Sequence, residues 1–158
     1  MKRAEIVHGL IETIRDNEDI ATVMDIIDWN EAFSYDGKFH LRKSDSKELQ
    51  DKSDDDLFYM IDKTLSHFSY VCYLRNQKVL KRKDMRSFEY CLKRIFDNYH
   101  IGNYLFSLYH WSKHLGTTMS FIFLIEYALK KGYLSESFTQ RNSTDYTCYL
   151  ELYDLVYQ

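Results

Sequence analysis

The chain contains no proline and only five glycines among its 158 residues, so it has few of the residues that interrupt helices. Average usage of about 5% would give about eight prolines. The absence of proline excludes proline-rich linkers and polyproline ligand segments, and it favours long helices. The three cysteines are widely spaced and form no CxxC pair, which favours buried thiols in a reducing cytoplasm over a disulfide framework.

Long apolar runs are absent as well. The longest candidate, MSFIFLIEYAL at 119–129, is shorter than the roughly 20 residues that span a bilayer, and it contains Glu126. The N-terminal segment lacks the apolar core of a signal peptide. We therefore expect a cytoplasmic protein that has no membrane partner. The net charge of −3 also excludes a uniformly basic nucleic-acid binder.

Apolar residues recur with the period of a helix over most of the chain. This pattern predicts helices over 3–16, after 16–19, and over 53–76, 85–97, 101–114 and 117–131. Ser53 or Asp54, and then Asp84, are the expected caps, and Gly116 and Gly132 suit left-handed helix ends. The sequence therefore predicts an all-α fold, a single domain over 1–158 built as a compact bundle of six or seven helices.

Two segments lack a clear helical period. Residues 35–55 are polar, and we expect them to form a surface connection with a short helix around 47–52. Residues 144–157 fit the period of a helix and that of a strand, with tyrosines at near-alternate positions. We favour a helix there because no second strand is evident for pairing.

The stretch YHWSKHLG places His110 and His114 four residues apart, so a helix would bring both imidazoles to one face. Helical zinc sites use this spacing, but they need a third ligand, and catalytic ones add a glutamate base. Trp111 occupies the position where that glutamate would stand. We interpret the stretch as a helix end, with Trp111 in the core, and keep a metal-dependent enzyme at these two histidines as an alternative.

Positive charge is concentrated over 75–94, which contains eight of the 21 basic residues. Such a turn between two helices can bind phosphates, and the neighbouring tyrosines could stack on bases. It can equally be a solvated turn or a surface for a protein partner. The candidate anion-binding or nucleic-acid-binding residues are Arg75, Lys78, Lys81, Arg82, Lys83 and Arg86.

Negative charge is concentrated over 16–36, which contains seven acidic residues and no lysine or arginine. This surface, together with the aromatic C-terminal segment, is the predicted docking site for a protein partner, because Tyr and Trp are favoured at binding hot spots. The tyrosines of the C-terminal segment could equally pack on the bundle. The candidate partner-binding residues are Asp25, Asp28, Trp29, Tyr146, Tyr149 and Tyr153.

Signatures of catalysis are missing from the sequence. It has no glycine-rich phosphate loop, no GxSxG elbow and no kinase or deaminase motif. Asp25 and Asp28 could pass for paired carboxylates, but no pocket or difference in their environments is visible. We therefore expect a protein that is not an enzyme and has no cofactor.

The middle of the chain, from LFYMIDKTLSHFSYVCYLRN through KRKDMRSFEYCLKRIFDN to YLFSLYHWS, resembles small helical bacterial proteins found among phage-defence and mobile-element genes, including abortive-infection-type proteins. The resemblance covers about a third of the chain and implies a non-catalytic role in phage–host conflict. We therefore expect an interaction domain that binds a protein partner and could self-associate, acting as a regulator, inhibitor or defence component. Nucleic-acid binding at 75–94 is the alternative.

Overall fold

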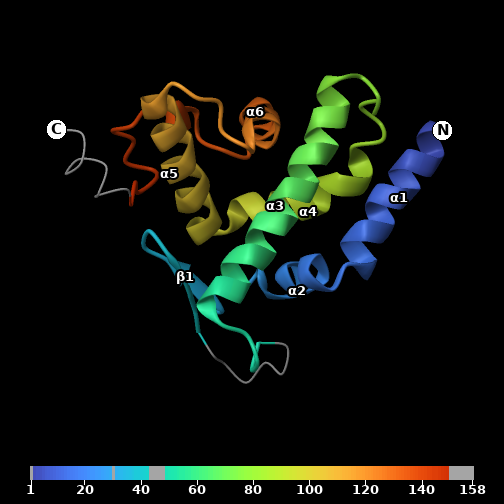
Figure 1. Cartoon of the computed structure of the whole chain (residues 1–158). Helices are drawn as coiled ribbons and strands as arrows, with labels where there is room; N and C mark the ends of the chain where they lie inside the picture. The colour runs from blue at the N-terminus through green and yellow to red at the C-terminus, as the bar shows by residue number, and fades with distance from the viewer. Residues whose placement is uncertain (1, 30, 43–48, 150–158) are drawn as a thin grey trace.

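Helix α3 (Asp54–Asn76) lies at the centre of the molecule (Figure 1). The structure is a computed structural model, and it describes residues 2–29, 31–42 and 49–149. Ser53 begins this helix with a capping box: its hydroxyl accepts a hydrogen bond from the Asp56 amide, and the Asp56 carboxylate accepts one from the Ser53 amide. The apolar residues at helical spacing along it are buried, namely Leu57, Ile61, Leu65, Phe68 and Cys72. Met60, Thr64 and Val71 are buried beside it, so α3 needs cover on more than one side.

Two asparagines form the sharp corners between consecutive helices. Asn17 separates α1 (Arg3–Asp16) from α2 (Glu18–Ile26), and Asn98 separates α4 (Arg86–Asp97) from α5 (Tyr99–Leu115). Each has an extended backbone, and its side-chain oxygen caps the helix that follows. The side-chain Nδ2 of Asn98 also donates to the Ile27 carbonyl at 2.8 Å, and this hydrogen bond connects the buried corner to the end of α2.

Glycines end the next two helices as the sequence predicts. Gly116 follows α5 with φ 71°, and Gly132 follows α6 (Ile122–Lys131) with φ 76°. Helix α6 begins later than the predicted Thr117, because the Thr117 amide and hydroxyl bond back to the Ser112 carbonyl and complete the end of α5 instead. A short 3-10 helix, η1 (Glu136–Thr139), follows.

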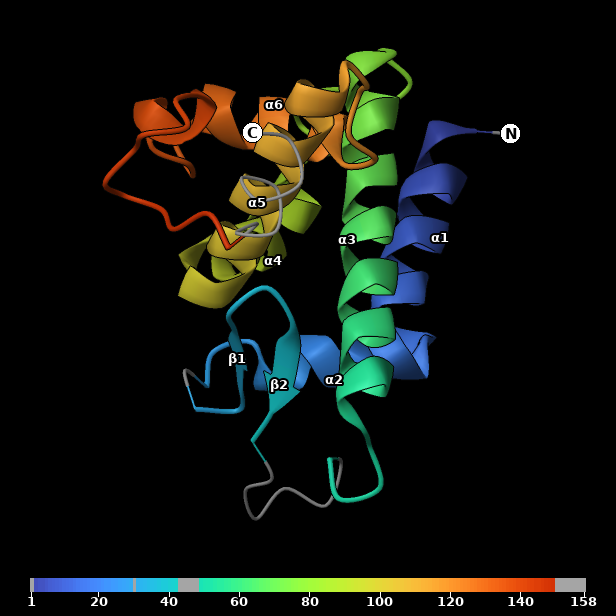
Figure 2. The same ribbon diagram turned by 60° about the vertical axis from the view of Figure 1, so that its left-hand side comes forward.

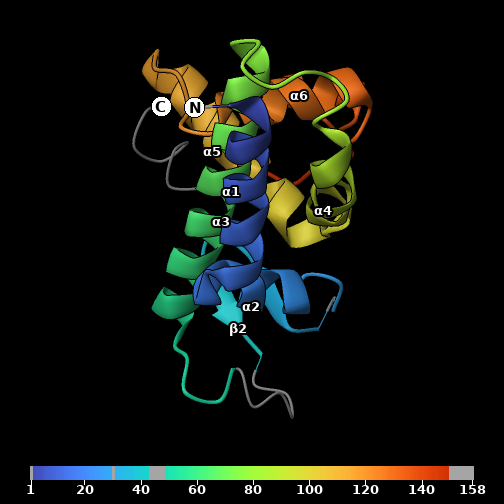
Figure 3. The same ribbon diagram turned by 90° about the vertical axis from the view of Figure 1, so that its right-hand side faces the viewer.

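The helices surround α3 on several sides. Helices α2 and α6 both pack on it, α1 packs on α2, and α4 and η1 pack on α5. Figures 2 and 3 show α1 and α6 on different sides of α3, with α2 at its N-terminal end. The prediction of an all-α bundle is confirmed, with six α-helices among the described residues. None of these helices has both the length and the apolar character that a membrane crossing requires.

The prediction that 35–55 is only a polar surface connection is wrong. A two-stranded antiparallel hairpin pairs β1 (Phe33–Tyr35) with β2 (Phe39–Leu41), and Tyr35, Phe39 and Leu49 are buried. Gly37 sits in the turn with φ 111°, a conformation that favours glycine. The signal was an Asp-Gly turn flanked by alternating aromatic residues, which a search for helical periodicity passes over. Of the short helix expected at 47–52, the part at 49–51 is a turn, and 43–48 lie outside the described residues.

The helix predicted over 144–157 is also wrong for 144–149, and the remainder lies outside the described residues. Residues 144–149 run along α5 without regular structure. The Thr147 amide donates to Asn103 Oδ1 at 3.0 Å, and the Tyr149 amide donates to Ser107 Oγ at 3.1 Å. Asn103 and Ser107 are fully buried and lie one helical turn apart, so α5 itself supplies partners that replace helical hydrogen bonds in this segment.

Two partly buried histidines join elements far apart in the sequence. His67 Nε2 on α3 donates to the Leu10 carbonyl of α1 at 3.1 Å, and His100 Nδ1 on α5 accepts from the Tyr35 amide of β1 at 3.1 Å. Burial lowers the pKa of both imidazoles, and Arg42 lowers that of His100 further. Both rings are therefore neutral in the fold at neutral pH.

We predict that the domain loses stability as the pH falls from 7.5 to 5.5. The unfolded chain takes up protons below the ordinary histidine pKa of about 6.5, whereas folded His67 and His100 resist protonation, so each contributes at most about 1.4 kcal/mol per pH unit. Thermal unfolding across this range measures the loss. His67→Gln with His100→Asn keeps one donor and one acceptor and should reduce the dependence without abolishing it, because burial also lowers the pKa of His110, which remains. The exposed control His8→Gln should not reduce it. A melting temperature that is independent of pH contradicts this prediction.

Candidate cationic pocket

The C-terminal end of α3 presents a lysine where glycine is usual. The Val79 amide donates to the Leu74 carbonyl at 2.9 Å, and the Lys78 amide donates to the Arg75 carbonyl at 3.0 Å. This pair of bonds is a Schellman motif, in which the residue at the Lys78 position adopts a left-handed conformation. Lys78 has φ 62° and is the only non-glycine residue with positive φ in the described ranges. Its side chain is therefore held at the helix end at a conformational cost.

The loop after α3 is tied down by one carboxylate. Asp84 Oδ2 accepts from the Lys81 amide at 2.7 Å and forms an ion pair with Arg3 Nε at 3.0 Å. Asp84 thus closes a turn, and the predicted Asp84 cap of α4 is not formed, since Met85 precedes that helix without a side-chain cap. Arg75 Nη1 donates to the Leu80 carbonyl at 3.3 Å, which orients the guanidinium beside the loop.

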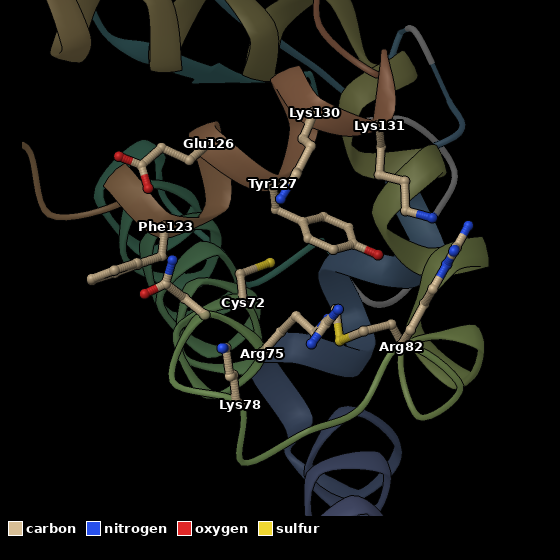
Figure 4. A pocket seen from close by; sticks show the side chains of 11 residues that line it. Cys72, Arg75, Lys78, Arg82, Phe123, Glu126, Tyr127, Lys130 and Lys131 are labelled. Atoms are coloured by element: carbon tan, nitrogen blue, oxygen red, sulfur yellow. The ribbon is translucent and has the colours of Figure 1, made fainter.

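A surface pocket of about 560 Å³ lies between α3, this loop and α6 (Figure 4). We call it the cationic pocket, because five basic side chains line it against one carboxylate, Glu126. The basic residues are Arg75, Lys78, Arg82, Lys130 and Lys131. Three of the six anion-binding residues predicted from the sequence therefore meet here. Lys81, Lys83 and Arg86 are exposed and do not line the pocket.

Lys130 and Lys131 are the basic pocket residues that the sequence did not predict. They stand in the last turn of α6, where cations favour the negative end of the helix dipole, and so they carry no functional signal alone. The packing of α6 on α3 brings them to the charges of 75–82. Lys131 forms an ion pair with Glu89 at 3.3 Å, whereas no such pair involves Lys130 within the described ranges.

The Tyr127 hydroxyl is buried at this pocket and has no hydrogen-bond partner among the described residues. Burial raises its pKa strongly, and the nearby Glu89 carboxylate raises it further, so the hydroxyl keeps its proton. Burial likewise raises the pKa of the neighbouring Cys72 thiol to about 12, so this cysteine is not a thiolate nucleophile. The pocket thus offers positive charge and a hydroxyl donor rather than nucleophilic chemistry.

Exposed aromatic rings continue from the pocket along α3. Phe123, a pocket residue, contacts Tyr73 with ring centroids 5.1 Å apart, and Tyr73 stacks on Tyr70 at 6.3 Å. Tyr70 is 51% exposed and Tyr73 is 40% exposed. We call these three rings the aromatic strip. Their position beside clustered cations is the combination that single-strand binding surfaces use.

The two histidines of YHWSKHLG do not form a metal centre with the described residues. His110 is buried, its Nε2 donates to the Phe138 carbonyl at 2.9 Å, and burial lowers its pKa. His114 is exposed near the end of α5, where its ring stacks on Trp111 at 6.0 Å. Within the described ranges no three His, Cys, Asp or Glu side chains are grouped as metal ligands.

The residues predicted to dock a protein partner do not form one surface, and several of them already contact other side chains of this protein. The Asp28 carboxylate binds Arg94, with Nη2 to Oδ2 at 2.7 Å, while Trp29 is 49% exposed beside it. Tyr146 stacks on Phe106 at 5.3 Å and accepts a hydrogen bond from the Ser135 amide.

Asp25 is exposed, Tyr149 packs edge-on against Tyr35 at 5.5 Å, and Tyr153 lies outside the described residues. Tyr146 and Tyr149 thus fit the alternative in which the C-terminal tyrosines pack on the bundle.

We predict that Lys78→Gly raises the free energy of unfolding by about 0.5–1 kcal/mol, because glycine adopts the left-handed conformation without a Cβ clash. Urea denaturation measures the change. Lys78→Ala removes the same charge but keeps the Cβ, so it is the matched control and should show no such gain. Equal stability of the two variants contradicts the assignment of backbone strain to Lys78.

Comparisons of the chain with protein-family models, with curated proteins and with solved structures gave no match. The function is therefore argued from the chemistry of the cationic pocket and the aromatic strip.

Proposed function

We propose that this protein binds single-stranded nucleic acid at the cationic pocket and the adjoining aromatic strip. One observation carries the proposal: five basic side chains from α3, the following loop and α6 converge on a pocket that the exposed rings of Tyr70 and Tyr73 and the half-buried ring of Phe123 adjoin. Positive charge attracts the phosphate backbone, and aromatic rings stack on unpaired bases whatever their sequence.

The local charge supports this proposal although the whole chain carries a net charge of −3. Among the described residues, Glu126 is the one carboxylate lining the pocket, and Glu89 forms an ion pair with one of the cations, Lys131. The other four cations have no ion-pair partner among the described residues. Such a local excess of positive charge concentrates the electrostatic field at a concave surface. The pocket therefore attracts anions although the protein as a whole is acidic.

Protein binding, which the acidic segment suggests, is less well supported by the geometry. Arg94 already holds the Asp28 carboxylate, and Tyr146 packs against Phe106. Trp29 and Asp25 remain exposed, so a protein partner at that surface stays a hypothesis. Self-association and a role in phage–host conflict stay hypotheses on the same footing.

We predict that affinity for a fluorescent single-stranded oligonucleotide falls with salt, with a slope of log K against log salt of about −2 to −3 for three or four phosphate contacts. Reversing the pocket charges with Lys78→Glu, Arg82→Glu and Lys130→Glu should lower affinity at least about tenfold and flatten the slope. Fluorescence anisotropy between 50 and 200 mM salt, roughly the range over which such contacts respond, measures both.

The matched control is Lys81→Glu, Lys83→Glu and Arg86→Glu, which makes the same change of charge on exposed residues outside the pocket. It should cost less affinity than the pocket variant, because it alters only the long-range field. Circular dichroism checks that both variants are folded. Equal losses in the two variants, or no binding by the unaltered protein, would contradict the proposal.

We also predict that Tyr73→Ala weakens single-strand binding about fivefold or more, the loss of one stacked base. Tyr59→Ala removes an exposed ring from the opposite end of the same helix, where Tyr59 is 62% exposed, and should leave affinity unchanged. Titration of both variants with the same oligonucleotide gives the comparison. A similar affinity for both variants shows that the aromatic strip does not contact bases.

A further inference from the structure

The cationic pocket has two chemically different ends. In Figure 4, Phe123, Glu126 and Lys78 lie at one side, and Arg82 and Lys131 lie at the other. The Tyr127 ring lies between them, and its hydroxyl points away from Phe123 toward the side of Arg82 and Lys131. An aromatic ring, a carboxylate and one lysine thus face one part of a ligand, while positive charge without a carboxylate among the lining residues faces another.

The positive end is suited to a phosphate group. Arg75 Nη1 is held by the Leu80 carbonyl, which leaves the other donors of its guanidinium for a ligand. Arg82 has no ion-pair partner among the described residues and lines the same pocket. Guanidinium groups match phosphate oxygens in bidentate geometry, so two arginines at one site favour a phosphate over a simple halide.

The Tyr127 hydroxyl gives independent support. Its oxygen is buried, has no partner in the described part of the chain, and keeps its proton because burial raises its pKa. A buried hydroxyl without a partner costs free energy in the unbound protein. Because the hydroxyl has almost no accessible surface in the unbound protein, a flexible side chain of the lining must move aside before an anionic oxygen can accept its hydrogen bond. The ligand would then satisfy a donor that has no partner among the described residues.

A terminal phosphate fits this end better than an internal one. A terminal monoester carries a charge of about −1.5 to −2 and three acceptor oxygens, whereas an internal diester carries one charge. A nucleic-acid strand bound by its end leaves a concave site in one direction only, whereas a strand bound at an internal phosphate must leave it in two directions. A pocket of 560 Å³ is of the size that encloses a small ligand, and Glu126 repels phosphate from the opposite end.

We propose that the cationic pocket binds the terminal nucleotide of a single strand, with its terminal phosphate at Arg75, Arg82 and the Tyr127 hydroxyl and its base against Phe123. Glu126 would accept a hydrogen bond from an amino group of that base, as carboxylates do from cytosine. This inference rests on the proposed single-strand binding and adds recognition of the strand end.

The test compares one oligonucleotide sequence with a 5′-phosphate, with a 3′-phosphate and with no terminal phosphate, using the full chain in an anisotropy assay. At least one phosphorylated form should bind about tenfold more tightly than the unphosphorylated form, the effect of added hydrogen bonds to a charged group. Equal affinity for all three overturns the inference while leaving salt-dependent single-strand binding intact. Absence of binding to all three overturns both.

A free nucleoside monophosphate with the same base distinguishes the other source of the same chemistry. It should compete with the phosphorylated oligonucleotide only weakly, because it lacks the bases that stack on Tyr73 and Tyr70. Competition as strong as that of the oligonucleotide itself shows that the pocket takes a free nucleotide, and this overturns recognition of a strand end.

Tyr127→Phe removes only the hydroxyl and separates ligand binding from folding. The variant should lose most of the preference for a terminal phosphate, about tenfold, while its melting temperature stays equal or rises, since a buried unpaired group is gone. Tyr90→Phe removes a hydroxyl from an exposed ring outside the pocket and is the matched control. A Tyr127→Phe variant that keeps the full preference excludes the hydroxyl from the phosphate site and overturns the assignment.

Discussion

The burial of α3 on more than one side is the constraint on which the rest of the structure depends. Leu57, Ile61 and Leu65 form one stripe, but Met60, Thr64 and Val71 are buried as well, so a single partner cannot cover the helix. Helix α2 and strand β2 pack on it, and α6 packs on it too. The elements that pack on α3 to bury its apolar side chains thus determine which loops and helix ends lie next to each other.

The cationic pocket is a consequence of that packing. Helices α3 and α6 each carry basic residues in their last turns, where cations compensate the negative ends of the helix dipoles. Separately, these residues are ordinary helix ends. Packing α6 on α3 joins them with Lys78 and Arg82, which belong to the loop between α3 and α4, in one concave site. The strained backbone of Lys78 and the Tyr127 hydroxyl, which has no partner in the described part of the chain, are local costs at this site, and both place polar groups at the pocket.

The helices were predictable from the sequence because their signals are local. Apolar spacing, the Ser53 cap and the glycines at 116 and 132 act within a few residues of the chain, and each has the predicted role. The hairpin was not predicted, because three-residue strands give little periodic signal and their aromatic residues become buried only against α5 and α3. Backbone amides within 144–149 likewise donate hydrogen bonds to buried Asn103 and Ser107, partners that no local pattern reveals.

The candidate site was likewise predictable only where its signal is local in the sequence. Arg75, Lys78 and Arg82 belong to a segment whose charge is evident along the chain, whereas Lys130, Lys131 and Tyr127 join them only through tertiary packing. Charge along the chain also could not separate Lys81, Lys83 and Arg86, which project elsewhere, from the residues that line the pocket.

The most direct test of the central claim is an NMR titration of the full chain with a short single-stranded oligonucleotide. The amide chemical shifts of residues 70–85 and 122–132 should change together, because these segments line one pocket, while those of α2 stay constant. Shift changes centred on Asp25 and Trp29, or no change at any residue, would contradict the assignment of nucleic-acid binding to the cationic pocket.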